Sequence, residues 1–144
     1  MAIRNIVTLG DDILRKKCRT QFDFDERLAV ILDDMADTMY KVEGVGLAAP
    51  QIGILRRFCI VDVGDGIIEL VNPVIVEQSG SQKGNEGCLS IPGRFNDVVR
   101  PLNVTVRAQD RNGKNFIVSA EGFKARALCH EIDHLDGILY IDRV

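Results

Sequence analysis

The two histidines of the chain, His130 and His134, lie four residues apart in the segment HEIDH. Residues at positions i and i+4 lie on one face of an α-helix, so both imidazoles can bind a single metal ion. Glu131 lies beside that face, where its carboxylate can accept a proton from an attacking water molecule without being a ligand. The segment therefore predicts a helix that carries part of a metal site.

The alternative interpretation of this segment is a solvent-facing helix with two surface histidines. The helical pattern extends from Phe123 to about Asp136, and Gly137 is placed to end the helix. Phe123 and Ala127 continue the histidine face toward the start of the helix, and both are apolar. We therefore expect this face to be buried, which favours the metal site.

A third protein ligand has to come from another part of the chain. The ten residues after His134 offer Asp136 and Asp142 as carboxylates, and Asp136 lies too close on the same helical turn. We therefore expect the ligand upstream, at Cys88 in the segment EGCLS. The glycine before this cysteine and a predicted polar loop over residues 78–85 would let its thiolate approach a metal closely. Three protein ligands leave one position for water, as catalytic sites require.

The other three cysteines are expected to have structural roles. Cys18 and Cys59 occur in ordinary helix-edge and strand contexts and are predicted to be small buried hydrophobic residues. Cys129 precedes His130, so its side chain points about a quarter turn away from the metal face. A disulfide involving Cys88 is the less favoured alternative, because the first twenty residues carry charges throughout and show no secretory signal.

A second helix is predicted over residues 23–41. Asp23 and Glu26 have the spacing of a capping box, which would start this helix. Apolar residues then recur at steps of four, three and four, as one buried helical face requires. These residues are Leu28, Leu32, Met35 and Met39.

The middle of the sequence predicts β-structure. The expected strands cover residues 58–63, 67–76, 104–108 and 116–118. Pro73 is expected to place the second half of its strand at a sheet edge. Asn112-Gly113 is typical of a two-residue hairpin loop. The order of elements predicts one α+β domain over residues 1–144, with antiparallel sheets packed around the C-terminal helix and a further N-terminal helix.

Charge and hydropathy exclude several classes of function. The formal net charge is −3 and no basic cluster is present, whereas nucleic-acid-binding proteins usually show a clustered positive surface. No apolar run approaches the roughly 20 residues that span a bilayer. We therefore expect no nucleic-acid or membrane surface, and the lack of a secretory signal in the first twenty residues leads us to expect a cytoplasmic enzyme.

The segment GVGLAAPQ, residues 44–51, contains a third set of candidate site residues. Its glycines match a dinucleotide-binding pattern, but a predicted helix precedes the segment instead of a strand, and Pro50 lies where the phosphate-binding helix should begin. An extended glycine-rich segment can instead lie against a peptide substrate, with the side chain of Gln51 as a hydrogen-bond donor.

Together, GVGLAAPQ, EGCLS and HEIDH resemble, in order and spacing, the three signature motifs of the peptide deformylases. The resemblance covers essentially the whole chain. It implies that Cys88, His130 and His134 are the metal ligands and that Glu131 is the general acid and base.

The resemblance also implies roles in substrate binding. The side chain of Gln51 and the backbone N–H of Leu89 would bind the developing oxyanion, and Gly46 would hydrogen-bond the peptide backbone. Looser expectations for the substrate pocket follow from position alone. These pocket residues are Val45, Glu86, Arg94 and Leu128.

The activity implied by the resemblance is hydrolysis of the formyl group from the N-terminal formyl-methionine of nascent polypeptides, with release of formate. The implied cofactor is one divalent metal ion, Fe²⁺, for which Ni²⁺, Co²⁺ or Zn²⁺ can substitute. The expected partners are N-formyl-methionyl peptides and the exit region of the ribosome, and the chain is expected to be a monomer. Two alternatives from the motif chemistry remain. One is an HExxH metallopeptidase, and the other is a non-catalytic module with a structural zinc site in which a second cysteine is the fourth ligand.

Overall fold

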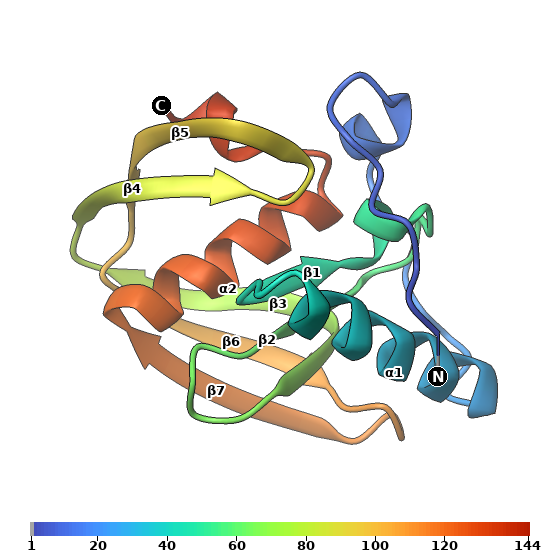
Figure 1. The fold of residues 1–144 in the computed structure, drawn as a ribbon. Coiled ribbons are helices and arrows are strands. Elements are labelled where there is room, and N and C mark those ends of the chain that lie inside the picture. Colours follow the sequence, from blue (N-terminus) through green and yellow to red (C-terminus); the bar gives the residue numbers. More distant parts are fainter. Residues whose placement is uncertain (1) are drawn as a thin grey trace.

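Helix α2, which spans Gly122–Leu135, lies between two β-sheets. The computed structural model describes residues 2–144. A five-stranded sheet covers one side of α2 and a two-stranded sheet covers the other (Figure 1). The second helix, α1 (Glu26–Lys41), packs beside the larger sheet. The predicted α+β class, with antiparallel sheets around the C-terminal helix, is confirmed.

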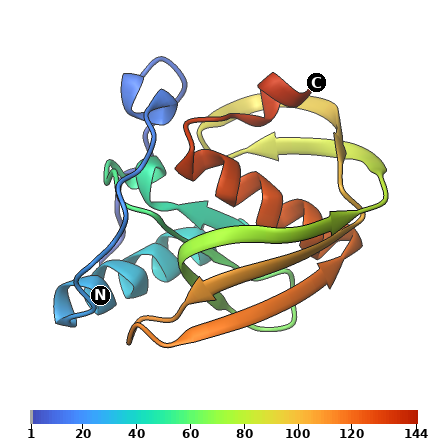
Figure 2. The ribbon, with the colours of Figure 1, turned by 180° about the vertical axis from the view of Figure 1, so that it is seen from behind.

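The strands of both sheets run antiparallel to their neighbours. The larger sheet has the order β1-β2-β3-β6-β7, and β4 pairs with β5 in the smaller one (Figure 2). The seven strands are β1 (Gly46–Ala48), β2 (Phe58–Val61), β3 (Ile68–Ser79), β4 (Gln82–Cys88), β5 (Ile91–Arg100), β6 (Asn103–Gln109) and β7 (Asn115–Glu121).

Helix α1 begins later than the sequence pattern predicts. Its N-cap is Asp25, whose carboxylate accepts a hydrogen bond from the backbone N–H of Leu28 at 3.1 Å. The predicted capping box of Asp23 and Glu26 is therefore wrong, because Asp25 already satisfies a free amide of the first turn. The predicted buried face is confirmed, since its leucines and methionines are almost wholly excluded from solvent.

Strand β3 pairs with β2 only over Ile68–Val71, and its second half pairs with β6 alone, so the prediction that the strand after Pro73 lies at a sheet edge is confirmed. The register with β6 shifts between Val71 and Val74, and Asn72 has a φ of 52°. This bulge removes the proline, which lacks an N–H, from the ladder of hydrogen bonds. The Asn72 side chain supports the bulge, because its amide donates to the Gln21 carbonyl at 2.8 Å.

The loops also differ from their predictions. Beyond the ends of β6 and β7 the N–H of Asp110 still donates to the carbonyl of Lys114, so this pair encloses a loop of three residues instead of two. Within it only Gly113 has a positive φ. The predicted polar loop over 78–85 belongs mostly to strands β3 and β4, which leaves Gly80 and Ser81 as the turn. Strand β5 is absent from the sequence prediction.

The end of α2 confirms the predicted role of Gly137. This glycine has a φ of 74°, and the N–H of Ile138 donates to the carbonyl of Asp133 at 2.9 Å. The pattern is that of a glycine-ended helix, in which a left-handed residue lets the chain turn back over the last carbonyls. Through this turn the chain reaches β5, against which the 3-10 helix η3 (Tyr140–Arg143) packs.

The hydrophobic core beneath α2 is formed by one helix face and the larger sheet. Leu128 and Leu135 pack there together with Cys59 and Val106. Cys18 and Cys59 are buried in this cluster, as predicted. Over residues 2–144, no helix has the length and apolar character needed to cross a membrane.

Candidate active site

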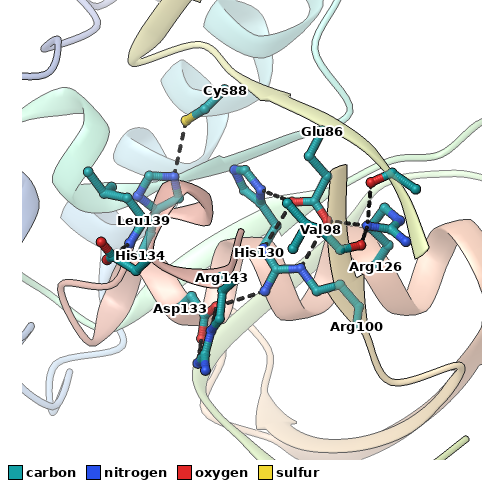
Figure 3. Close-up of polar contacts among 12 residues, drawn as sticks. Glu86, Cys88, Val98, Arg100, Arg126, His130, Asp133, His134, Leu139 and Arg143 are labelled. Atoms are coloured by element: carbon teal, nitrogen blue, oxygen red, sulfur yellow. Dashed lines mark hydrogen bonds and ion pairs between the residues drawn. The ribbon is translucent and has the colours of Figure 1, made fainter. Parts of the chain in front are cut away.

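The three predicted metal ligands come together between β4 and α2. Cys88 ends β4, and His130 and His134 project from α2 (Figure 3). The Sγ atom of Cys88 lies 3.3 Å from Nε2 of His134, and the candidate donor atoms of all three residues lie within 4.8 Å of one another. A thiolate and two imidazoles suit a divalent transition metal. The residues therefore fit the metal that the sequence motifs predict.

The histidine face of α2 is buried, as predicted, but only from Ala127 onward. Ala127, His130 and His134 are all buried, whereas Phe123 is 57% exposed. Phe123 occupies the first turn of α2 and lines the open cavity, so the prediction that it extends the buried face is wrong.

Glu131 lies next to the ligands in a buried position. Its Oε1 atom has no hydrogen-bond partner among the residues that the structure describes. Burial raises the pKa of Glu131 to about 7, although the neighbouring His130 opposes this rise. A carboxylate with a pKa near neutrality is suited to both accept and donate a proton in a reaction at neutral pH.

Gly46 in β1 lies directly against Glu131. A Cβ atom at position 46 would lie 2.8 Å from both Cγ and Cδ of Glu131, closer than such atoms can approach. The backbone φ at this position is not in the left-handed region, so the glycine is needed for space and not for backbone conformation. The close approach of β1 thus fixes where the Glu131 carboxylate can lie.

Gln51 is fixed with its amide nitrogen toward the ligands. Its Oε1 atom accepts a hydrogen bond from the N–H of Ala48 at 2.9 Å. Its Nε2 atom donates to Oγ of Ser90 at 3.1 Å and lies 3.6 Å from Sγ of Cys88. The side chain, which belongs to the 3-10 helix η2 (Ala49–Ile52), therefore presents a hydrogen-bond donor beside the predicted metal position.

Glu86 supports a metal ligand instead of presenting a free carboxylate to a substrate. Its Oε1 atom accepts a hydrogen bond from Nδ1 of His130 at 2.9 Å, and both of its oxygens accept from Arg100 (Figure 3). Burial would raise the pKa of Glu86, but these hydrogen bonds outweigh it and hold the pKa well below the usual value. Because an ionised carboxylate only accepts, Nδ1 of His130 carries the proton and Nε2 is free for a metal.

A cavity of about 450 Å³ opens onto these residues. Gln51, Glu86, Cys88, His130 and Glu131 all line it. The remaining wall is largely apolar and includes Val45, Leu89, Phe95, Phe123 and Ala127. The predicted site residues Val45, Gly46 and Leu89 therefore line the same cavity as the predicted ligands Cys88 and His130.

Two of the predicted pocket residues lie elsewhere. Leu128 is fully buried in the core beneath α2. It precedes His130 by two positions, which places its side chain on the opposite face of the helix. Arg94 is exposed, and its Nε atom donates to the side chain of Asn96 at 3.1 Å. The expectation that these two residues line the pocket is not supported.

Sequence reasoning missed Ser90, Arg100 and Arg126 as parts of the site. Ser90 lies within the EGCLS segment but received no role. Arg126 precedes His130 by four residues, so helical spacing alone places it on the histidine face. Arg100 has no such signal, because the strand that carries it was not predicted.

Comparison with known proteins agrees with this geometry. The family profile described as polypeptide deformylase matches residues 3–144. The chain belongs to the peptide deformylase family. A peptide deformylase of Caldicellulosiruptor bescii is 56% identical over 144 residues, which cover all of this chain and 87% of that protein.

Solved structures of peptide deformylases share the fold. The enzyme of Thermotoga maritima has a TM-score of 0.98 at 41% identity, over all of this chain and 99% of its own. The enzyme of Legionella pneumophila has a TM-score of 0.96 at 47% identity, over 99% of this chain and 86% of its own. The family resemblance inferred from the three motifs is confirmed.

The contact between Gly46 and Glu131 leads to a first prediction. In Gly46→Ala the new methyl group should displace the Glu131 side chain, and kcat should fall by about 10²-fold, the scale expected for a misplacement of about 1 Å. Bound metal, measured by elemental analysis, should stay at the parent level, because the atoms nearest to the new methyl group belong to Glu131 and not to a ligand. In a Glu131→Gln background the same change should have little further effect. Full activity of Gly46→Ala would show that the Glu131 position is not under this constraint.

Proposed function

We propose that the chain removes the formyl group from the N-terminal formyl-methionine of nascent polypeptides and releases formate. The observation that carries this proposal is the meeting of Cys88, His130 and His134 beside Glu131, where all but His134 line one cavity. Membership of the peptide deformylase family supports the same reaction over a metallopeptidase.

The site fits a catalytic metal better than a structural one. Within residues 2–144 the ligand cluster contains three donors, whereas a structural zinc site has four protein ligands. Cys18, Cys59 and Cys129 are packed in the core beneath α2. A divalent ion held by the three ligands would supply Lewis acidity, which lowers the pKa of water and polarises a carbonyl group.

Glu131 is assigned both proton transfers. Its carboxylate would accept a proton from the attacking water and deliver it to the nitrogen of the departing peptide amine. Its unpaired, buried Oε1 atom and its pKa of about 7 support this role. Proton transfer by a positioned group typically contributes about 10²–10⁴ in rate.

Gln51 and Leu89 are assigned the stabilisation of the oxyanion. The Nε2 atom of Gln51 faces the site, and the N–H of Leu89 follows the ligand Cys88 in the chain. Hydrogen-bond donors aimed at the developing negative charge stabilise the transition state more than the substrate.

The substrate would lie along β1 with its methionine side chain in the cavity. Strand β1 is an edge strand, so its backbone groups at Gly46 are free to bind an extended peptide. The apolar wall that includes Val45 and Phe123 suits an unbranched thioether side chain.

All residues assigned to the reaction come from one chain, so a monomer should be sufficient for activity. We also propose that the reaction takes place in the cytoplasm near the ribosome exit, where formylated N-termini of new polypeptides would become accessible. If the monomer is active, specific activity should not fall when the enzyme is diluted. A fall on dilution would indicate an active oligomer.

The test of this function is a formate-release assay on a formyl-methionyl peptide, with Glu131→Gln as the control. The parent should release formate and leave the internal peptide bonds intact. Glu131→Gln should keep the metal and lose about 10²–10⁴ in turnover, because an amide cannot accept the proton. Internal cleavage by the parent would favour a metallopeptidase, and near-normal turnover of Glu131→Gln would refute the assigned role.

Gln51→Leu should lower kcat more than it raises KM. One oxyanion donor is worth about 10²–10³ in rate, and the N–H of Leu89 would remain, so some activity should persist. Steady-state kinetics on the same formyl peptide separate the two parameters. A change in KM alone would instead assign Gln51 to ground-state binding.

We further propose Fe²⁺ as the native metal, as the family resemblance implies. Protein prepared anaerobically with Fe²⁺ should be the most active form and should lose activity in air, because iron beside a partly exposed thiolate is open to oxidation. Ni²⁺ or Co²⁺ should give an air-stable active enzyme, and Zn²⁺ a weaker one. Equal or greater activity with Zn²⁺, or activity without metal, would contradict this assignment.

A further inference from the structure

The metal ligands belong to two separate parts of the fold, so their geometry requires interactions that fix the position of these parts relative to each other. Cys88 ends β4 in the two-stranded sheet, whereas His130 and His134 belong to α2. We propose that Arg126 is a positioning residue that ties α2 to the two-stranded sheet through Glu86 and thereby sets the geometry of the metal ligands. This inference rests on the proposed metal site.

The guanidinium of Arg126 reaches from α2 into the two-stranded sheet. Its Nη1 atom donates to Oε2 of Glu86 at 2.5 Å, to the carbonyl of Val98 at 3.1 Å and to the carbonyl of Gly84 at 3.4 Å (Figure 3). Its Nη2 atom donates to the side chain of Gln82 at 3.4 Å. All four acceptors belong to β4 or β5, so Arg126 connects both strands to the helix.

Strand β4 is shaped to accept this arginine. A Cβ atom at Gly84 would lie 2.9 Å from Nη2 and 3.1 Å from Cζ of Arg126, so the strand backbone lies directly on the guanidinium. Gly84 does not have a left-handed backbone, which means that its missing side chain serves this contact. Any larger residue would push the guanidinium away from its acceptors.

Arg126 differs from Arg100 in what it connects. Arg100 and Glu86 both belong to the two-stranded sheet, so the two bonds between them do not attach that sheet to α2. Arg100 reaches the helix only through Asp133, at 2.7 Å. Arg126 starts from α2 and binds Oε2 of the carboxylate whose Oε1 accepts from His130, so it attaches this carboxylate to the helix that carries the ligand.

Arg126 also lines the cavity, but its contacts favour positioning over substrate binding. The side chain is buried, and both terminal nitrogens are already bonded to the protein. An arginine available to a substrate carboxylate would need free donors that face the cavity. We therefore expect its loss to affect metal binding before it affects substrate affinity.

The experiment measures the metal dissociation constant of Arg126→Met by chelator competition with Ni²⁺. Methionine keeps much of the side-chain volume but removes the hydrogen bonds to the two-stranded sheet. Affinity should fall about 10- to 100-fold, the usual effect of losing a group that orients a ligand. The matched control is Lys124→Met, which removes a cation of the same helix that pairs at the surface with Asp65, and its affinity should equal that of the parent.

A double mutant distinguishes positioning from general stabilisation. If Arg126 acts through Glu86, then Arg126→Met should change the affinity little in a Glu86→Gln background. Independent effects that multiply would show that Arg126 merely stabilises the fold, and would overturn the proposal. Gly84→Ala offers a second route, because it displaces the guanidinium without removing its charge, and it should also weaken Ni²⁺ binding.

The remaining outcomes are equally decisive. Parent-level Ni²⁺ affinity in both Arg126→Met and Gly84→Ala would overturn the proposal. A rise in the KM of Arg126→Met with unchanged Ni²⁺ affinity would also overturn it, because Arg126 would then be a substrate-binding residue. If Arg126→Met does not fold, the Ni²⁺ affinity of Gly84→Ala tests the proposal in its place. A parent protein that binds no Ni²⁺ would instead refute the metal site itself, so the two failures are distinguishable.

Discussion

The structure of the site depends on the buried carboxylate of Glu86. It accepts hydrogen bonds from His130, Arg100 and Arg126, and so it joins the two-stranded sheet to α2. Burial of charged groups costs about as much as their attraction returns, so such a cluster adds little net stability. Loss of one partner, however, leaves an uncompensated charge, which typically costs about 3–5 kcal/mol. The cluster therefore serves mainly to hold one arrangement of the ligand-bearing elements.

The parts of the site that could be predicted from the sequence are those encoded locally. The spacing of His130 and His134 on one helix, with Glu131 beside them, requires only helical geometry. The assignment of Cys88 came from the lack of a suitable ligand after His134 and from the EGCLS segment, and the family resemblance implied the same residue. Gly137 was predicted correctly because the end of a helix is also a local feature.

The features that could not be predicted depend on contacts between distant segments. Pro73 correctly indicated an edge, but the bulge at Asn72 beside it depends on a hydrogen bond to the distant Gln21 and has no local signal. Helical spacing places Arg126 on the histidine face, but its hydrogen-bond acceptors in β4 and β5 are distant in sequence and could not be predicted. Leu128 was placed in the pocket by position, whereas helix rotation directs it into the core.

The central claim is that three protein ligands hold one metal ion beside Glu131 and leave a coordination position open. A crystal structure of the metal-loaded protein tests this claim most directly. The account predicts one ion per chain, bound by the sulfur of Cys88 and the Nε2 atoms of His130 and His134, with no fourth protein ligand. An ion bound by a fourth protein group, or bound without the sulfur of Cys88, would contradict it.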